Sequence, residues 1–340
     1  MLPLIPLAAI VSAALAGGAG IAKGVDAHGK HKKAQNIMRE AESMIESAQN
    51  SLRESVNRSD EALSNLGSRK LKVLDGSMDR FIFLFEMIHN IELKDSSGLD
   101  ELRKYRIDKQ EVHELKSMSL LATEILGGLV GGAGAGALTA FGAYSATMAF
   151  ASASTGTAIA TLSGIAAQNA ALAFLGGGAL VAGGGGMALG GAVLGGLVAG
   201  PALLVLGFVA DNAAQENLEK ALSNKEQAKV FVEELRTTET LCNGISKRAT
   251  MFHDLLDKLD TIFVRKIHDL QLIIKSVGTD YAQYNEYTQN QVAMCLSIAG
   301  AIKTVLDTPI LHEDGSLTTE SVNTYNELSR FCETLENAEG

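Results

Sequence analysis

Apolar residues in the N-terminal third of the chain recur at alternating spacings of three and four positions. An early seam of this kind ends at Ala48, and a stronger one follows Gly67, while charged side chains lie off both. This spacing is typical of the a and d positions of long amphipathic helices. It predicts helix from about residue 25 to 91, with these seam residues: Ala34, Ile37, Ala41, Met44, Ala48, Leu71, Leu74, Met78, Phe81, Phe85 and Ile88.

The C-terminal third repeats the pattern. It predicts helices at about 213–235, 246–277, 290–306 and 318–335, with turns at 277–280 and 313–315. A further helix is expected from about Asp108, after a loop at 95–98. The inner face of the 246–277 helix is predicted to hold Phe252, Leu255, Leu259, Ile262, Leu270 and Ile273. Outside the centre of the chain no segment alternates with a period of two, so we expect an all-α fold.

The centre of the chain carries no charge at all. From Ile125 to Ala210 there are 86 consecutive residues without Asp, Glu, Lys, Arg or His, and 22 of the 35 glycines of the chain lie there with 23 alanines. Glycine costs about 1 kcal/mol relative to alanine in a helix, so close packing of backbones has to compensate. The expected architecture is a bundle of long amphipathic helical or coiled-coil arms that flank a Gly/Ala-rich apolar helical hairpin.

Small residues in this segment are spaced four apart. Such stripes are the packing surface of many membrane helices, in which glycine lets two backbones approach. We therefore predict three packing stripes for membrane insertion and helix association: Gly128, Gly132 and Gly136; Gly178, Ala182, Gly186 and Gly190; Ala192, Gly196 and Gly200.

Two interpretations of the charge-free segment remain open. A hairpin of two membrane spans, at about 125–150 and 187–210, would keep both charged flanks on one side of a bilayer. A buried Gly/Ala core inside a helical bundle would produce the same stripes. Residues 1–22 are also uncharged, and they fit a membrane-associated helix, a helix buried within the protein or a cleavable signal peptide.

Charge divides the chain into four expected regions: the apolar N-terminus (1–22), an N-terminal helical arm (23–124), the charge-free segment (125–210) and an acidic C-terminal arm (211–340). The first arm has 17 basic and 18 acidic residues, and the second has 12 and 21. An overall charge of −10 argues against nucleic-acid binding. The stretch 313–339 holds seven acids and one arginine, which fits a solvated tail or a docking segment for a basic protein partner.

No motif assembles a catalytic or cofactor site. Residues 183–188 match the letters of G-x-G-x-x-A, but no strand precedes them and no acid follows within twenty residues. His28 and His31 are interpreted as part of a basic turn rather than as metal ligands, and Asp254, Asp257 and Asp260 as a solvated helix face. The three cysteines lack metal-site spacing, which favours reduced thiols. We expect no enzyme activity, no cofactor and no metal.

Several stretches resemble a widespread group of uncharacterised bacterial glycine-zipper proteins. They are GAGALTAFGAY at 134–144, STGTAIATLSG at 154–164, NAALA at 169–173, LGGG at 175–178, AGGGGMA at 182–188, LGGLVAGP at 194–201 and DTPIL at 307–311. The resemblance implies a bacterial origin and transfers no activity. In layout alone, the chain is similar to the α-helical pore-forming toxins of bacteria and to apolipoprotein L channel proteins.

The sequence thus favours a membrane-inserting, non-enzymatic protein, such as a pore-forming toxin or an abortive-infection effector. Its expected partners are a lipid bilayer and further copies of itself, and its expected location is the cytoplasm, the bacterial inner membrane or both. The alternative is a soluble or peripheral helical scaffold with the Gly/Ala segment as its packing core.

Overall fold

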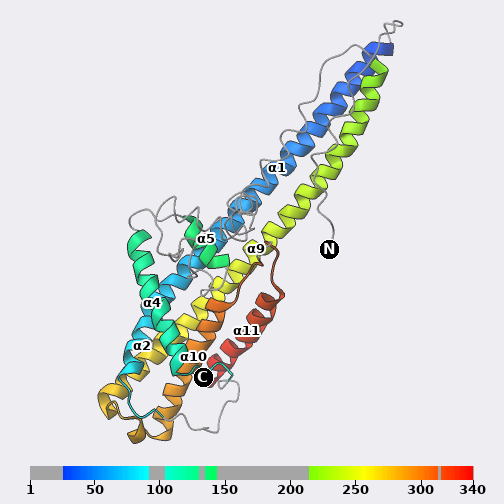
Figure 1. The fold of residues 1–340 in the computed structure, drawn as a ribbon. Coiled ribbons are helices and arrows are strands. Elements are labelled where there is room, and N and C mark those ends of the chain that lie inside the picture. Colours follow the sequence, from blue (N-terminus) through cyan, green and yellow to red (C-terminus); the bar gives the residue numbers. More distant parts are fainter. Residues whose placement is uncertain (1–25, 92–103, 130–134, 144–213, 313–314, 340) are drawn as a thin grey trace. The chain divides into compact units, whose positions relative to one another are not determined.

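The computed structural model describes residues 26–91, 104–129, 135–143, 214–312 and 315–339. In this part of the chain the regular elements are helices, accompanied by two isolated β-bridges, which confirms the all-α fold. The elements are α1 (Asp26–Val73), the π-helical turn η2 (Leu74–Met78), α2 (Asp79–Glu86), α4 (Lys109–Leu129), α5 (Ala135–Ala143), α9 (Ala214–Val277), the short 3-10 helix η7 (Tyr281–Gln283), α10 (Glu286–Asp307) and α11 (Thr319–Glu339) (Figure 1).

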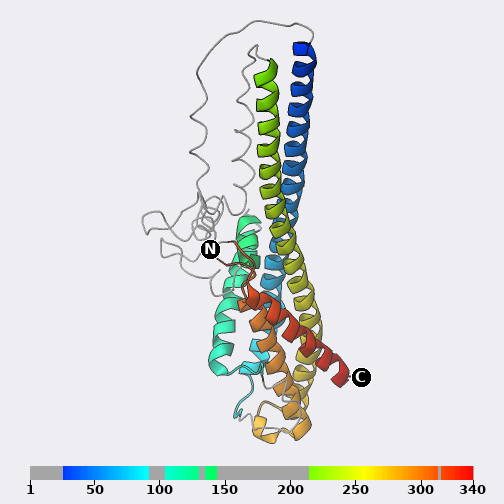
Figure 2. The same cartoon turned by 90° about the vertical axis from the view of Figure 1, so that its right-hand side faces the viewer.

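The chain forms two compact units, and the described residues of the smaller one are 26–46 and 214–232. Within this unit, the start of α1 and the start of α9 run side by side in the same direction (Figures 1 and 2). Lys225 Nζ lies 2.7 Å from a carboxylate oxygen of Glu40. The buried side chains are mostly small, so the two backbones can pack closely: Ala34, Ala41, Ile45, Ala221, Ala228 and Val232.

In the larger unit, the continuous stretch of α1, η2 and α2 is again parallel to α9. Hydrogen bonds join residues that are 183 to 191 positions apart along the whole contact, and this near-constant offset requires the same chain direction. The bonded pairs are Arg58–Asn243, Arg69–Asp260, Ser77–Asp260, Arg80–Gln271 and Asn90–Asp280. Parallel helices cannot be joined by a short turn, and the described part of the chain between them includes α4 and α5.

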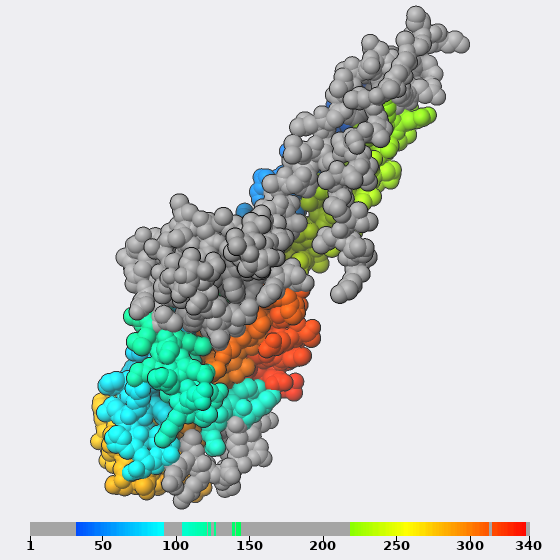
Figure 3. All heavy atoms as spheres, viewed as in Figure 1, coloured from blue at the N-terminus to red at the C-terminus, as the bar shows by residue number. Residues whose placement is uncertain are grey.

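Three further helices pack on this pair. α4 runs antiparallel to η2 and α2, because Lys116 bonds Glu86 while Ser119 bonds the carbonyl of Leu74. α10 is antiparallel to α9, with the Cys295 thiol against the Lys266 carbonyl. α11 follows α9 in the parallel sense through the pairs Arg248–Ser321 and Phe252–Tyr325. In the space-filling view, α4 lies between α2 and the pair α10 and α11 (Figure 3).

The predicted seams at 71–88 and 252–273 form the core of the larger unit. Phe81 stacks on Phe85 and contacts Phe263 of α9, with ring centroids 5.6 and 5.3 Å apart. The inner face predicted for 246–277 is buried at all six positions. Full burial of one such apolar side chain contributes about 1.5–3 kcal/mol, so these seams hold the bundle together. In the first seam, Ile37 and Met44 are only half-buried, and Ile45 takes the core position instead.

The prediction of separate helices at 213–235 and 246–277 is wrong, since α9 is continuous from Ala214 to Val277. Thr237, Thr238 and Thr240 lie between the two predicted helices. The hydroxyl of each bonds the carbonyl four residues earlier, so their polar groups are satisfied within the helix. Cys242 and Ile245 are buried, which keeps this stretch on the bundle.

The other helix ends lie close to their predicted positions. The first helical stretch ends at Glu86 rather than near 91, and Asn90 there has a φ of 56°. α10 begins at Glu286, where the side chain of Asn285 accepts a bond from the Thr288 amide as an N-cap. The break at 277–280 is confirmed, with Gly278 at a φ of 101°. The predicted loop at 95–98 lies outside the described residues.

Candidate functional site

Residues 125–129 of the charge-free segment form the end of α4, and residues 135–143 form helix α5, which packs inside the larger unit. Thr139, Phe141 and Ala143 are at most 3% exposed. We call the surface that holds this helix, together with the helix residues that contact it, the α5 dock. Its members are Leu63, Gly67 and Lys70 of α1; Leu138, Thr139, Phe141, Gly142 and Ala143 of α5; and Leu306, Asp307, Ile310 and Leu311.

The centre of the α5 dock is a contact between two glycines. A Cβ on Gly67 would lie 1.9 Å from the carbonyl oxygen of Leu138, and a Cβ on Gly142 would lie 1.9 Å from that of Leu63. No real side chain tolerates such distances, so both positions require glycine for the backbones to meet. α1 and α5 therefore cross by the close-packing principle that the sequence suggested for the charge-free segment.

The end of α5 is held by a second segment that is far away in sequence. The carbonyl oxygen of Ala143 accepts hydrogen bonds from the amides of Ile310 (2.8 Å) and Leu311 (3.2 Å). These bonds satisfy a helix-terminal carbonyl that has no partner within its own helix. Two of the stretches that carry the resemblance to glycine-zipper proteins, 134–144 and 307–311, thus lie against each other.

Lys70 is fully buried in the α5 dock, at 0% exposure. Its Nζ lies 3.4 Å from the carbonyl oxygen of Leu306 and 5.9 Å from the centroid of the Phe141 ring. Burial lowers the pKa of Lys70 from 10.5 to about 7, and the nearby Asp307 carboxylate opposes that shift. The sequence pattern does not reveal this residue because lysine normally stays in water, although position 70 falls between Leu66 and Leu74 at core spacing.

The end of α10 contributes the charges nearest to this lysine. Lys303 Nζ lies 2.8 Å from Asp307 and 3.7 Å from Glu114 of α4. Although burial lowers the Lys303 pKa, these carboxylates more than offset that effect, and the pKa is raised. α5 itself brings no charged side chain, because its sequence is AGALTAFGA.

The described residues include only some positions of the predicted glycine stripes. Gly128 lies in the last turn of α4 and Gly136 in the first turn of α5. Gly132 and every predicted stripe position from Gly178 to Gly200 lie outside the described residues. The glycines that make the observed close approach, Gly67 and Gly142, belong to none of the three predicted stripes. The sequence marks Gly67 only as the start of a seam, since a partner helix cannot be identified from spacing.

Of the three acids predicted to form a solvated face of α9, Asp254 and Asp257 are exposed and Asp260 is not. Asp260 is only 14% exposed, and it accepts a 2.7 Å bond from Arg69 and another from Ser77. Arg69 Nε also lies 2.6 Å from Asp257. Asp257 and Asp260 therefore link α9 to α1. Asp254 and Asp257 nevertheless lie on the solvated face, with 68% and 55% of their side chains exposed.

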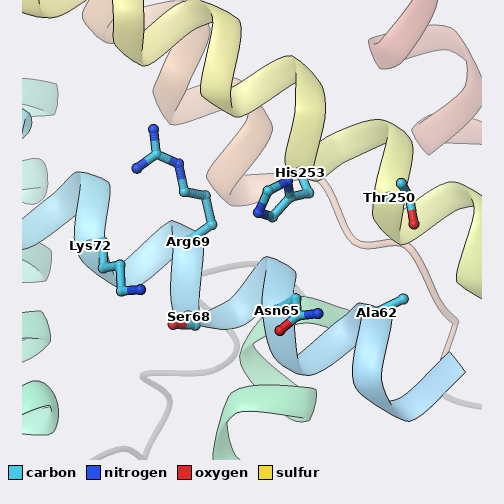
Figure 4. Close-up of a pocket in the computed structure, with 7 residues that line it drawn as sticks. All are labelled: Ala62, Asn65, Ser68, Arg69, Lys72, Thr250 and His253. Atoms are coloured by element: carbon cyan, nitrogen blue, oxygen red, sulfur yellow. The ribbon is translucent and has the colours of Figure 1, made fainter. Parts of the chain in front are cut away.

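A groove of about 240 Å³ lies beside these ion pairs (Figure 4). Arg69 extends from α1 toward α9, and His253 projects from α9 beside it. The groove is polar, but Asp257 and Asp260 already balance the charge of Arg69, and Asp254 contacts His253 at 3.3 Å. This arrangement stabilises the helix pair and leaves little net charge to attract an anionic ligand. Its lining residues are Ala62, Asn65, Ser68, Arg69, Lys72, Thr250 and His253.

A second cavity, of about 270 Å³, is lined by the chain before α4 and by residues of α4, α10 and α11. Lys104 pairs with Glu327 there, and the Tyr105 ring lies 4.9 Å from that of Phe331. The acidic stretch at the C-terminus is thus not simply a solvated tail. α11 buries one apolar face on the bundle, made of Leu328, Phe331, Cys332 and Leu335.

Nothing in the described residues assembles reactive chemistry. The thiols of Cys242, Cys295 and Cys332 are free and buried, and burial raises the pKa of each. Across 26–91, 104–129, 135–143, 214–312 and 315–339, no group of three or more His, Cys, Asp or Glu residues is placed to hold a metal ion. In those same ranges, no helix combines the length and the apolar character that crossing a bilayer requires.

Comparison with known proteins gives no relatives: no family model, curated protein or solved structure matches the chain. The resemblance to bacterial glycine-zipper proteins therefore stays a prediction.

Proposed function

We propose that this chain is a non-enzymatic, membrane-active α-helical protein whose bundle holds one end of the Gly/Ala-rich segment until that segment enters a bilayer. The observation that carries the proposal is the α5 dock. It fixes α5, a described helix that lies wholly within the charge-free segment, through the glycine contact of Gly67 and Gly142. The permeabilising activity, as of a toxin or an abortive-infection effector, would reside in the segment itself.

The chemistry of the α5 dock suits a releasable contact. Apart from Phe141 and Leu138, α5 offers small side chains, so it buries little apolar area that would be lost on undocking. The segment from 125 to 210 carries no charge that would have to be transferred into lipid. Once released, its glycine stripes would pack helices of several copies together in the membrane.

The proposal also covers the origin, the location and the partners of the protein. We place it among bacterial glycine-zipper proteins, in the cytoplasm, at the inner membrane or at both. Its partners would be the bilayer and further copies of itself, and the exposed acidic face of α11 would be available to a basic protein.

A helical scaffold is the second candidate, and the burial of α5 favours it. Ile310 and Leu311 bond Ala143, and Phe141 is 3% exposed, as expected if α5 belongs permanently to the core. In that case the segment would serve packing, and no bilayer would be needed.

Vesicles of phosphatidylethanolamine and phosphatidylglycerol separate the two candidates. The full chain should float with vesicles and release a trapped dye, and Gly132→Glu and Gly196→Glu should each abolish release because a buried charge opposes insertion. Gly76→Glu is the matched control, since Gly76 is exposed and a Cβ added to it would meet no atom within 4 Å. A chain that leaves vesicles intact and stays unbound supports the scaffold.

A further inference from the structure

Lys70 sits where three parts of the bundle meet. It projects from α1, its Nζ contacts the last turn of α10 at Leu306, and it lies over the Phe141 ring of α5. One turn earlier on the same helix is Gly67, which forms the glycine contact with α5. If this position served packing alone, an apolar side chain would stabilise the bundle better than lysine, because burying a charged amine is costly. A buried lysine at this point makes the packing of α5 depend on its charge.

The geometry points to Lys70 as a charge-sensitive latch of the α5 dock, in which proton uptake by the buried amine weakens the packing of α5 on α1. The consequence at a membrane, earlier release of the Gly/Ala segment, rests on the proposed function. The latch itself does not, because it concerns the bundle alone.

The direction of the effect follows from the shift of the Lys70 pKa. The docked state lowers it from 10.5 to about 7, so between these values the undocked chain binds more protons than the docked one. The α5 dock is therefore most stable above pH 10.5, and it loses stability as the pH falls toward 7. Below about pH 7 both states are protonated, and Lys70 adds no further change.

The charged groups around the latch come from α10, α4, α1 and α9. Asp307 of α10 faces Lys70 and raises its pKa. Lys303 of α10 pairs with Asp307 and with Glu114 of α4. On α1, Arg69 is turned toward Asp257 and Asp260 of α9. α5 brings none. Removing the Asp307 charge should thus lower the Lys70 pKa further and extend the sensitive range to lower pH.

A single tryptophan reports on the α5 dock, since the chain has no other. Leu138→Trp places it on α5, where Leu138 is partly buried against the core. Urea titrations of the full-length protein without membranes, followed by tryptophan emission between about pH 7 and about pH 9.5, give the undocking equilibrium. Lys70→Met in the same background removes the titrating group and keeps an unbranched side chain.

We expect the undocking constant of the Leu138→Trp protein to fall by at least about tenfold from about pH 7 to about pH 9.5, and by no more than about twofold with Lys70→Met. Asp307→Asn, titrated also below pH 7, should extend the dependence into that range, which tests the latch even if Lys70→Met does not fold. An undocking constant that is independent of pH, or an unchanged dependence in Lys70→Met, would overturn the latch. If vesicles stay intact while the pH dependence holds, the proposed function fails and the latch stands.

Discussion

Gly67 of α1 and Gly142 of α5 meet backbone to backbone: a Cβ on Gly67 would lie 3.0 Å from the Gly142 nitrogen, and one on Gly142 would lie 3.1 Å from the Gly67 nitrogen. The contact fixes α5, which lies wholly within the charge-free segment, on the bundle. Each glycine also faces a carbonyl oxygen at 1.9 Å from its Cβ position, so neither backbone can yield without moving the whole helix.

Gly67→Ala should separate α5 from α1. We expect it to destabilise the protein by about 1–3 kcal/mol, because overpacking outweighs the gain of alanine in a helix. Chemical unfolding followed by circular dichroism measures the loss. Gly76→Ala adds a methyl group in open space, so it should leave the stability unchanged or raise it by up to about 1 kcal/mol. Equal stabilities of the two variants would mean that α5 does not pack on Gly67.

Gly300→Ala should displace the chain that precedes α4. A Cβ on Gly300 would lie 1.7 Å from the carbonyl oxygen of Tyr105, and Tyr105 packs on Phe331 of α11. We expect a loss of about 1–3 kcal/mol in the free energy of unfolding. Gly244→Ala is the matched control, because its Cβ would meet only the end of the flexible Leu317 side chain, at 3.0 Å. Similar losses from both would contradict the close approach at Gly300.

Asp260→Asn should weaken the link between α1 and α9. Asp260 is mostly buried and accepts bonds from Arg69 and Ser77, so removing its charge leaves Arg69 poorly compensated. We expect a loss of about 1–3 kcal/mol, measured by urea unfolding at neutral pH. Asp254→Asn, on the exposed side of the same helix, should change stability by less than about 0.5 kcal/mol. If both variants unfold alike, the Arg69–Asp260 pair contributes nothing.

The native thiols should be unreactive. Burial raises the pKa of Cys295 to about 12 and that of Cys332 to about 11, and the thiolate is the reactive form. With an aromatic disulfide reagent at about pH 8, we expect both to react more than about a hundredfold slower in the folded protein than in denaturant. Fast labelling of Cys295 without unfolding would show that α10 is not packed on α9 as described.

The helices themselves could be predicted, because the seams at 71–88 and 252–273 carry an apolar pattern that only one helix face can satisfy. The parallel direction of α1 and α9 could not, since direction depends on contacts such as Arg58–Asn243 between residues 185 positions apart. The α5 dock was missed for a related reason. Gly142 looks like any other glycine of the segment until Gly67 is placed opposite it, and Lys70 is buried against its usual preference.

Flotation and dye release with the Gly67→Ala and Gly76→Ala proteins test the central claim, that the α5 dock restrains a membrane-inserting segment. Because Gly67→Ala frees α5 from the glycine contact, this variant should bind vesicles and release dye faster than the unmodified chain. Gly76→Ala should behave like the unmodified chain. If Gly67→Ala loses stability yet releases no more dye than Gly76→Ala, the α5 dock restrains nothing that inserts, and the claim is contradicted.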